Sequence, residues 1–252
     1  MAQNDPRSDV SECADTEGMQ KTLWGESEMR LFIVGATGGI GAQLVEQALT
    51  RGHRVTAFVR VPEKVGRTHE RLTVVVGNPL DAEQLRQALP GNDVVLSAIG
   101  PSPRPRPSFT AGRKNLSAGN GHSEHIAQSV HRDLAHSLVP AMESASVRRL
   151  VAVSSAFLFS DALIPAVFGR LLFRDTVNDV AEMERTIVAS KLQWTIVRPP
   201  ELTDGSRTEN YRVKNGHLPG FGFRVSRADV AHFMLDEIQA GLHYRKVVGV
   251  CY

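Results

Sequence analysis

The sequence predicts an α/β fold with a doubly wound, mostly parallel sheet and helices on both faces. Apolar runs of strand length alternate with amphipathic segments of helix length between residues 31 and 239, a pattern that joins parallel strands through helical crossovers. The runs are continuously apolar, which indicates strands buried on both faces. With 252 residues, 42% of them hydrophobic, and only two cysteines, the chain can bury one large core without disulfide or metal staples.

Each element is expected where its own pattern is found. Six apolar runs predict the strands, which are Leu31–Val34, Val55–Val59, Leu72–Val76, Val94–Ile99, Leu150–Val153 and Trp194–Val197. Five segments of helical periodicity predict the helices, which are Ile40–Thr50, Asp81–Leu89, Glu124–Ser146, Asp179–Ser190 and Ser226–Gln239. Ser226 is expected to cap the last helix, with Asp229 as a capping-box-like acid. Trp194 is expected in the core, and Glu184 and Arg185 on a solvated helix face.

Three segments interrupt this alternation. Residues 1–28 carry seven acidic and two basic residues without an apolar period, so we expect a disordered acidic tail before a single domain at 29–252. Residues 101–123 contain prolines, arginines and no acid, and we expect a long basic loop there. Residues 199–222 are rich in proline and glycine and are expected to form a small substrate-side lobe. Both loops leave the carboxyl end of the sheet, where such folds bind ligands.

Charge and hydropathy limit the classes of partner. The net charge is +2 and the tail contributes −5, so the rest of the chain carries +7. Such a body suits a polyanionic cofactor or an anionic substrate, whereas no helix-turn-helix, zinc or aromatic-basic pattern indicates nucleic acid. No run approaches the ~18 apolar residues of a membrane span, and no signal-peptide pattern is present. We expect a cytoplasmic protein, a monomer or weak homodimer, without nucleic-acid or membrane partners.

The glycine-rich run Gly35-Ala36-Thr37-Gly38-Gly39-Ile40-Gly41 directly follows the first strand and opens an amphipathic helix. Glycines at these positions permit a tight turn, a close approach of backbone N–H groups to a pyrophosphate, and close packing of helix on strand. The helix N-terminus attracts the anion. Strand, turn and helix occur in the order that a Rossmann-like dinucleotide-binding domain requires. The alternative is a glycine-rich turn that binds nothing.

The end of the second strand indicates which dinucleotide is bound. NAD-preferring sites place Asp or Glu there to bind the ribose 2′-hydroxyl, whereas this strand ends in Val59-Arg60. An arginine suits a 2′-phosphate through a charge-assisted contact. Lys64, four residues later, can add a second positive charge. The sequence therefore favours NADP over NAD, although Arg60 could also be a solvated surface residue.

Further motifs occur in the order found in one protein family. With the glycine-rich run and Arg60, the chain resembles the atypical short-chain dehydrogenases/reductases of the NAD(P)H-binding, NmrA-like type, and within them most closely the biliverdin reductase B or flavin reductase group. The resemblance covers residues 29–241. It rests on the motifs Val76-Gly77-Asn78-Pro79-Leu80-Asp81, Ser154-Ser155-Ala156-Phe157-Leu158, Leu192-Gln193-Trp194-Thr195-Ile196-Val197-Arg198-Pro199-Pro200 and Ser226-Arg227-Ala228-Asp229-Val230-Ala231-His232-Phe233-Met234-Leu235.

The resemblance implies roles for residues at the strand ends. The pyrophosphate would contact Gly35, Thr37, Gly38, Gly39, Ile40 and Gly41. The 2′-phosphate would contact Arg60 and Lys64, and the adenine would lie between Asn78 and Pro79. The nicotinamide side would be lined by Ile99, Gly100, Ser154, Ser155 and Pro199.

Three departures from the family pattern affect what it implies. Asn78 stands where an aspartate is usual, and Glu201 stands where the biliverdin reductase B group has an active-site histidine. The basic loop at 101–123 is longer than in that group. Since Glu201 and the loop lie on the substrate side, the resemblance supports the cofactor better than it supports biliverdin or flavin as the substrate.

The chemistry expected is hydride transfer without a tyrosine base. The main branch of this superfamily uses a Tyr-x-x-x-Lys pair about a dozen residues after a serine, but the stretch 164–169 after Ser155 contains no tyrosine. A conjugated acceptor such as a flavin, quinone or tetrapyrrole needs mainly positioning. Ser155 could bind the substrate or carboxamide, and Glu201 could relay a proton. Their alternatives are a serine bonded to backbone and a solvated glutamate.

Two other classes of function stay open. A regulator that senses NADP without consuming it would use the same cofactor site, and only turnover separates it from a reductase. An epimerase, isomerase or dehydratase would use the cofactor transiently, but the missing tyrosine weakens this alternative. We expect no metal site, because the histidines at 122, 125, 131 and 136 lack the spacing and acid partner of a His-Glu-x-x-His motif.

Overall fold

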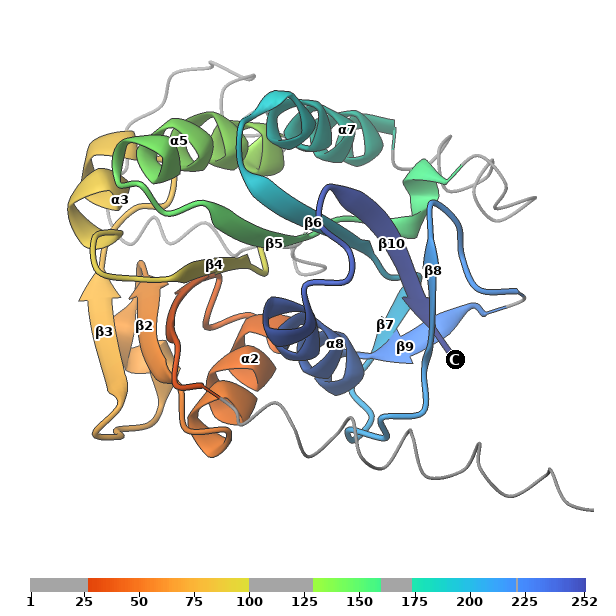
Figure 1. Cartoon of the computed structure of the whole chain (residues 1–252), viewed down its shortest axis with the longest axis horizontal. Helices are drawn as coiled ribbons and strands as arrows, with labels where there is room; N and C mark the ends of the chain where they lie inside the picture. The colour runs from red at the N-terminus through yellow and green to blue at the C-terminus, as the bar shows by residue number, and fades with distance from the viewer. Residues whose placement is uncertain (1–26, 100–128, 160–173, 221) are drawn as a thin grey trace, which may run out of the picture.

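The computed structural model describes residues 27–99, 129–159, 174–220 and 222–252. An eight-stranded sheet forms the centre of this part of the chain (Figure 1). Its strands in spatial order are β3 (Leu72–Val76), β2 (Arg54–Val59), β1 (Arg30–Val34), β4 (Val94–Ser97), β5 (Arg149–Val153), β6 (Gln193–Arg198), β10 (Lys246–Cys251) and β8 (Arg212–Asn215). The helices on one face are α3 (Ala82–Ala88), α5 (Val130–Ser144) and α7 (Arg174–Ala189), and those on the other face are α2 (Gly39–Thr50) and α8 (Arg227–Ala240) (Figure 1).

Seven neighbouring strands of the sheet run parallel. Leu31 of β1 lies opposite Val55 of β2 and Val94 of β4, and the pairing continues in parallel from β4 through β5 and β6 to β10. Helices connect these strands across both faces, as predicted from the alternating pattern, so the doubly wound Rossmann-like fold is confirmed. Because these strands are parallel, their carboxyl ends all lie at the same end of the sheet.

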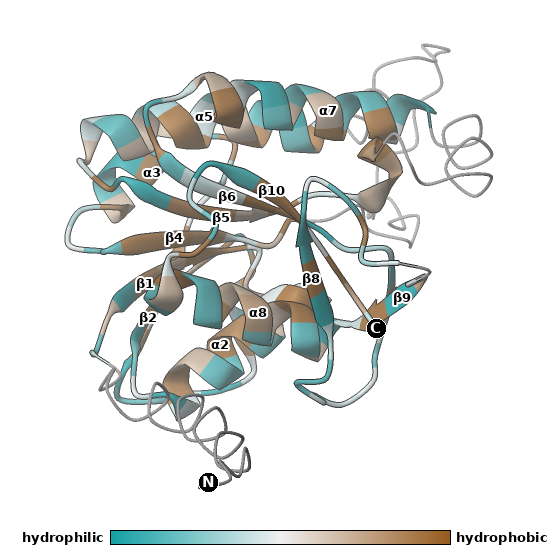
Figure 2. Ribbon diagram, turned by 45° about the vertical axis from the view of Figure 1, so that its right-hand side comes forward, coloured by the Kyte–Doolittle hydropathy of each residue, from teal (hydrophilic) through white to brown (hydrophobic). Residues whose placement is uncertain are grey.

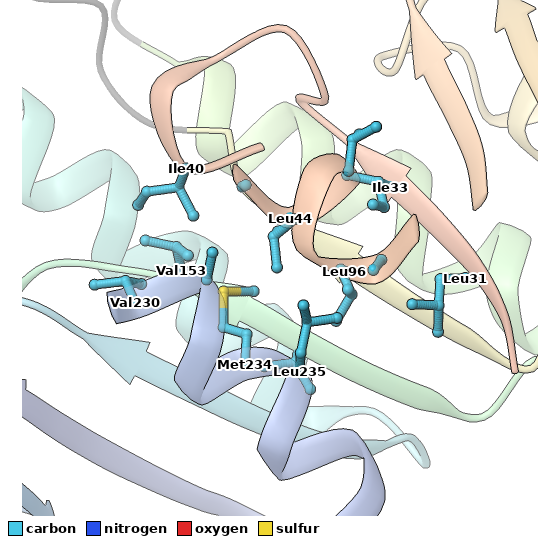
Figure 3. Close-up of a cluster of buried hydrophobic side chains, with 14 of the residues drawn as sticks. Leu31, Ile33, Ile40, Leu44, Leu96, Val153, Val230, Met234 and Leu235 are labelled. Atoms are coloured by element: carbon cyan, nitrogen blue, oxygen red, sulfur yellow. The ribbon is translucent and has the colours of Figure 1, made fainter. Parts of the chain in front are cut away.

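The core forms two apolar layers, one on each face of the sheet. Figure 3 shows the layer beneath α2 and α8, where Leu44 and Met234 point toward Leu96 and Val153 of the sheet. The other layer joins the sheet to α3, α5 and α7, and it includes Trp194, which is buried as predicted. Burial on both faces explains why the strands are continuously apolar in sequence.

The edge of the sheet that β8 forms is polar. β8 pairs with β10 in antiparallel fashion, and all four of its residues, Arg212 to Asn215, are exposed. Figure 2 shows β8 mostly in teal, whereas the inner strands β4 and β5 are mostly brown. Charged side chains on an edge strand oppose the addition of further strands.

The structure corrects several element boundaries. The segment 199–222, expected to form a small substrate-side lobe, contains β8 of the main sheet and also β7 (Glu201–Thr203), which pairs with β9 (Arg224–Ser226) in a separate two-stranded sheet. β10 was missed, although its residues 247–250 form an apolar run of strand length. The helix expected at Asp179–Ser190 is described from Arg174, where the described residues resume, and ends at Ala189. The helix expected at 124–146 begins at Val130, after its N-cap Ser129, and ends at Ser144. Residues 124–128 of the expected helix lie outside the described residues.

The small sheet is tied to α8 through Asp229. The backbone N–H of Asp229 donates to Ser226 Oγ at 2.9 Å, so the predicted N-cap is confirmed. The buried carboxylate of Asp229 also accepts bonds from the backbone N–H groups of Thr208 and Glu209 and from the hydroxyl of Tyr252. Burial alone would raise the pKa of Asp229, but these hydrogen bonds outweigh it and hold the pKa below its ordinary value.

The tail and the basic loop expected at 101–123 fall in the undescribed ranges 1–26 and 100–128. Glu28, at the end of the expected tail, is described and accepts a bond from Arg54 Nε at 2.7 Å. Among the described helices, none is long and apolar enough to cross a membrane. Cytoplasmic location and oligomeric state stay predictions.

Candidate functional site

The turn between β1 and α2 has the geometry of a dinucleotide-binding loop. Gly35 has φ +84°, and a Cβ at this position would lie 2.9 Å from the backbone of Ala98, which follows β4. The N–H of Gly38 donates to the carbonyl of Gly35 at 2.9 Å and closes the turn. A Cβ on Gly41 would lie 2.0 Å from the same carbonyl oxygen. Only glycine fits at 35 and 41, because helix, turn and neighbouring strand approach one another closely.

The N-terminus of α2 points out of this turn and is open to an anion. Gly38 is its N-cap and provides no side-chain bond, and the first turn contains no acidic residue. Thr37, Gly38 and Gly39 are exposed, whereas Ile40 is buried and anchors the helix in the core. Backbone N–H groups at such an end bind phosphates well, since the helix dipole adds to their hydrogen bonds.

Arg60 and Lys64 lie beyond the carboxyl end of β2. Arg60 directly follows Val59, and Lys64 lies in a short 3-10 helix, Pro62–Val65; both side chains are exposed. Val59 also accepts a backbone bond from the N–H of Gly77 at 2.9 Å. This bond holds the ends of β2 and β3 together, so Arg60 lies near the segment that follows β3.

Asn78 and Pro79, expected beside the adenine, form the turn between β3 and α3. Asn78 Oδ1 accepts a bond from the N–H of Leu80 at 3.2 Å, and Gln84 Oε1 accepts one from the N–H of Asn78 at 2.8 Å. Asp81 caps α3. The side chain of Asn78 thus shapes the turn, and its predicted adenine contact stays a prediction.

The ends of β4, β5 and β6 bring together the residues expected on the nicotinamide side. The N–H of Ser154 donates to Val197 at 2.7 Å, and the N–H of Ala156 donates to Pro199 at 3.0 Å. Ser154 and Ser155 are half-buried, as is Ile99 after β4, and Pro199 is buried. Gly100 lies outside the described residues. The Oγ of Ser155 accepts a bond from the N–H of Phe157 at 3.4 Å, as its alternative interpretation predicted.

Glu184 was predicted on a solvated face, and this prediction was wrong. Its carboxylate is buried, and it accepts bonds from Arg198 Nε at 2.9 Å and Arg198 Nη2 at 2.5 Å. The hydroxyl of Ser154 donates to the same carboxylate. Arg198 also lies 4.7 Å from the ring centre of Phe159. By contrast, Arg185 is exposed as predicted, in an ion pair with Glu182.

This buried cluster determines the hydrogen-bonding role of Ser154. Because the hydroxyl proton is directed at Glu184, the lone pairs of Ser154 Oγ are left to accept a bond from another group. Ser154 lies at the carboxyl end of β5, in the expected nicotinamide region. The arrangement suits contact with an amide N–H and makes Ser154 a poor proton donor.

The structure does not bring Glu201 into this cluster. Glu201 lies at the start of β7 opposite Arg224, its side chain is exposed, and no hydrogen bond links it to Ser154 or Ser155 among the described residues. Tyr211 is no substitute for the missing tyrosine. Its hydroxyl is 2.9 Å from Nδ1 of His232, and burial, aided by nearby carboxylates, raises the pKa of Tyr211 well above its ordinary value.

The described residues contain no group of three or more His, Cys, Asp or Glu side chains arranged to hold a metal ion. His131, one of the histidines considered from the sequence, is buried and lies 2.8 Å from Asp179. The interaction joins α5 to α7, so His131 has a structural role in packing. His122 and His125 lie outside the described residues.

Fold and turn together define a dinucleotide-binding protein of the Rossmann class. The family model for NAD(P)H-binding proteins matches residues 35–240, and the chain belongs to this family. The chain is 33% identical over 192 residues to a 3-diazoavenalumate denitrifying reductase of Streptomyces sp, covering 68% of this chain and 55% of that protein. It is 33% identical over 129 residues to a 3-beta-hydroxysteroid dehydrogenase of Mycolicibacterium neoaurum, covering 50% and 32%.

Among solved structures, the chain is similar to a Rossmann-fold NAD(P)-binding family protein from Shigella flexneri, with 25% identity and a TM-score of 0.61 over 88% of this chain and 92% of that one. The two relatives above are longer than the matched region, since this chain spans 55% of one and 32% of the other. The comparisons therefore support the predicted atypical short-chain reductase family. The particular likeness to the biliverdin reductase B group stays a prediction.

Proposed function

We propose that the chain is an NADPH-dependent reductase that passes hydride to a conjugated small-molecule acceptor, such as a flavin, quinone or linear tetrapyrrole. The observation that carries the proposal is the tight turn at 35–41, where a Cβ on Gly35 or Gly41 would clash with neighbouring backbone. The absence of side chains at these two positions allows the close-packed turn that a dinucleotide-binding loop requires. Family membership and the likeness to a relative named as a reductase support it. When bound, the dihydronicotinamide supplies the hydride.

NADPH is proposed over NADH because of the charges beyond β2. Arg60 and Lys64 are both exposed there, and no Asp or Glu occupies the strand end where a ribose 2′-hydroxyl would be bound. A guanidinium can bind a 2′-phosphate through two parallel hydrogen bonds. Lys64 would add a second positive charge to the same phosphate.

A conjugated acceptor is proposed because the described site favours positioning over proton transfer. Ser154 directs its proton at Glu184, and the pKa of Tyr211 is too high for a base near neutral pH. Ser155 is proposed to bind the substrate or the carboxamide through its hydroxyl. Glu201 is proposed to relay a proton from the exposed lobe when substrate is bound. Holding the two reactants in a productive geometry then supplies most of the rate.

The test follows NADPH absorbance with the full chain and a panel of flavins, quinones, tetrapyrroles and small enones. We expect turnover of at least one acceptor, with kcat lowered less than ~10²-fold by Ser155→Ala or Glu201→Gln, since neither is an indispensable acid or base. Glu209→Gln, also exposed in the lobe, is the matched control. Tight NADPH binding without any turnover would refute the reductase and favour the NADP-sensing regulator. Conversion of a metabolite without net NADPH loss would favour an epimerase.

A further inference from the structure

The side chain of Arg227 crosses the first turn of α2. Arg227 is the first residue of α8, and α8 packs beside α2 on the same face of the sheet (Figure 1). A Cβ on Gly39 would lie 2.4 Å from Cδ and 2.7 Å from Nε of Arg227. Gly39 therefore gives room to an arginine from another helix. A guanidinium is thus placed at the helix end that is open to an anion.

Arg227 is paired with an exposed carboxylate. Its Nη1 lies 2.6 Å from Oδ1 of Asp204, which follows β7. The side chain of Asp204 is 91% exposed, whereas that of Arg227 is 25% exposed. The arginine is therefore held in place by packing, and the aspartate can leave it at little cost, since pairs with a solvated partner contribute little stability.

The capping of the helices also distinguishes this position. Asp81 caps α3, and Ser226 caps α8 with Asp229 in the first turn. The first turn of α2 has neither a side-chain cap nor an acid. The N–H groups of this turn and the guanidinium of Arg227 thus form one positive region. Asp204 is the carboxylate that pairs with Arg227 there.

We propose that Arg227 binds the pyrophosphate of the dinucleotide, and that Asp204 is a resting counter-ion which the pyrophosphate displaces. The inference rests on the proposed function, because it assigns a further ligand within the same cofactor site. The pyrophosphate is common to NADPH and NADH, so Arg227 contributes equally to both affinities. Arg60 differs in this respect, since its proposed contact is with the 2′-phosphate alone.

The test is calorimetric titration of the full chain with NADPH and with NADH. Arg227→Met keeps an unbranched apolar stem over Gly39 and removes the charge. We expect Arg227→Met to lower the affinities for NADPH and NADH by the same factor, about tenfold to a hundredfold, as for the loss of a hydrogen bond to a charged group. Asp204→Asn should raise both affinities by about two- to fivefold, which corresponds to the usual interaction energy of an exposed ion pair. The control is Arg207→Met, an exposed arginine paired with Glu209, which should change neither.

The double variant separates the two contributions. In the Arg227→Met background, Asp204→Asn should no longer raise the cofactor affinity, because Asp204 competes with the pyrophosphate only for the guanidinium of Arg227. If Arg227→Met does not fold, as judged by urea unfolding, Asp204→Asn alone must still strengthen binding. If the wild-type chain binds the cofactors, two results would overturn this inference and leave the proposed function intact. One is a folded Arg227→Met with unchanged affinities for NADPH and NADH, and the other is an Asp204→Asn with no gain in affinity. A wild-type chain that binds neither cofactor would instead refute the proposed function.

Discussion

Replacing Glu184 by leucine tests whether the cluster at the carboxyl ends of β5 and β6 is as buried as its geometry indicates. The side chains of Glu184 and Arg198 are only 9% and 14% exposed. Glu184→Leu leaves the guanidinium of Arg198 and the hydroxyl of Ser154 without their shared acceptor. Removing one partner of a buried ion pair costs about 3–5 kcal/mol, since the other charge stays buried and uncompensated.

The assay is thermal and urea unfolding followed by circular dichroism. For a domain of this size, 1 kcal/mol lowers Tm by about 2–4 °C, so Glu184→Leu should lower it by about 6–20 °C. The control is Glu182→Leu on the same helix, whose pair with Arg185 is exposed at 37% and 70%. That variant should lose no more than about 1 kcal/mol.

A second substitution separates the loss of the pair from the loss of packing. Adding Arg198→Met to Glu184→Leu removes the uncompensated charge, so the double variant should regain most of the lost stability. Equal losses for Glu184→Leu and Glu182→Leu would show that the pair is solvated. A double variant less stable than Glu184→Leu would show that Arg198 stabilises the fold independently of its partner.

Three further changes test the cofactor site and the lobe. Wild-type protein should bind NADPH at least about tenfold tighter than NADH, and Arg60→Asp should shrink the gap while Arg67→Asp preserves it, as measured by calorimetry. Gly41→Ala should cost at least about 1–3 kcal/mol on urea unfolding, since its Cβ would meet the Gly35 carbonyl at 2.0 Å. Asp229 has a lowered pKa, so its stabilisation is present above about pH 4 and lost on acidification. Asp229→Asn should therefore destabilise at neutral pH by an amount that shrinks toward acid.

The parts of the fold set by local pattern could be predicted from the sequence. The turn at 35–41 is defined by glycines within one short segment, and the N-cap Ser226 by a bond to a residue three positions later. Strand β10 and its partner β8 are joined by long-range pairing. Their local sequences do not specify which strand they join, so their place in the main sheet was not predicted.

Glu184 was misplaced because its partner is distant in sequence. Arg198 lies on β6, beyond the end of α7, and no helical spacing relates the two residues. A signal was nevertheless present. Glu184 lies four residues after Val180 and three before Ile187, both buried, and such positions share one helix face. An acid on an apolar face indicates a buried partner, which the sequence alone does not identify.

The spatial order of the strands at one edge of the sheet differs from their order in the chain. β8 is the edge strand on this side but precedes β10 in the chain, although β10 is the strand that joins it to β6. While the ribosome has yet to make Lys246–Cys251, β8 has no neighbour in the main sheet and β6 has an open edge. An open edge of a buried strand recruits other chains. A nascent chain that stalls before Lys246 should therefore aggregate more readily than one that has added the six residues of β10.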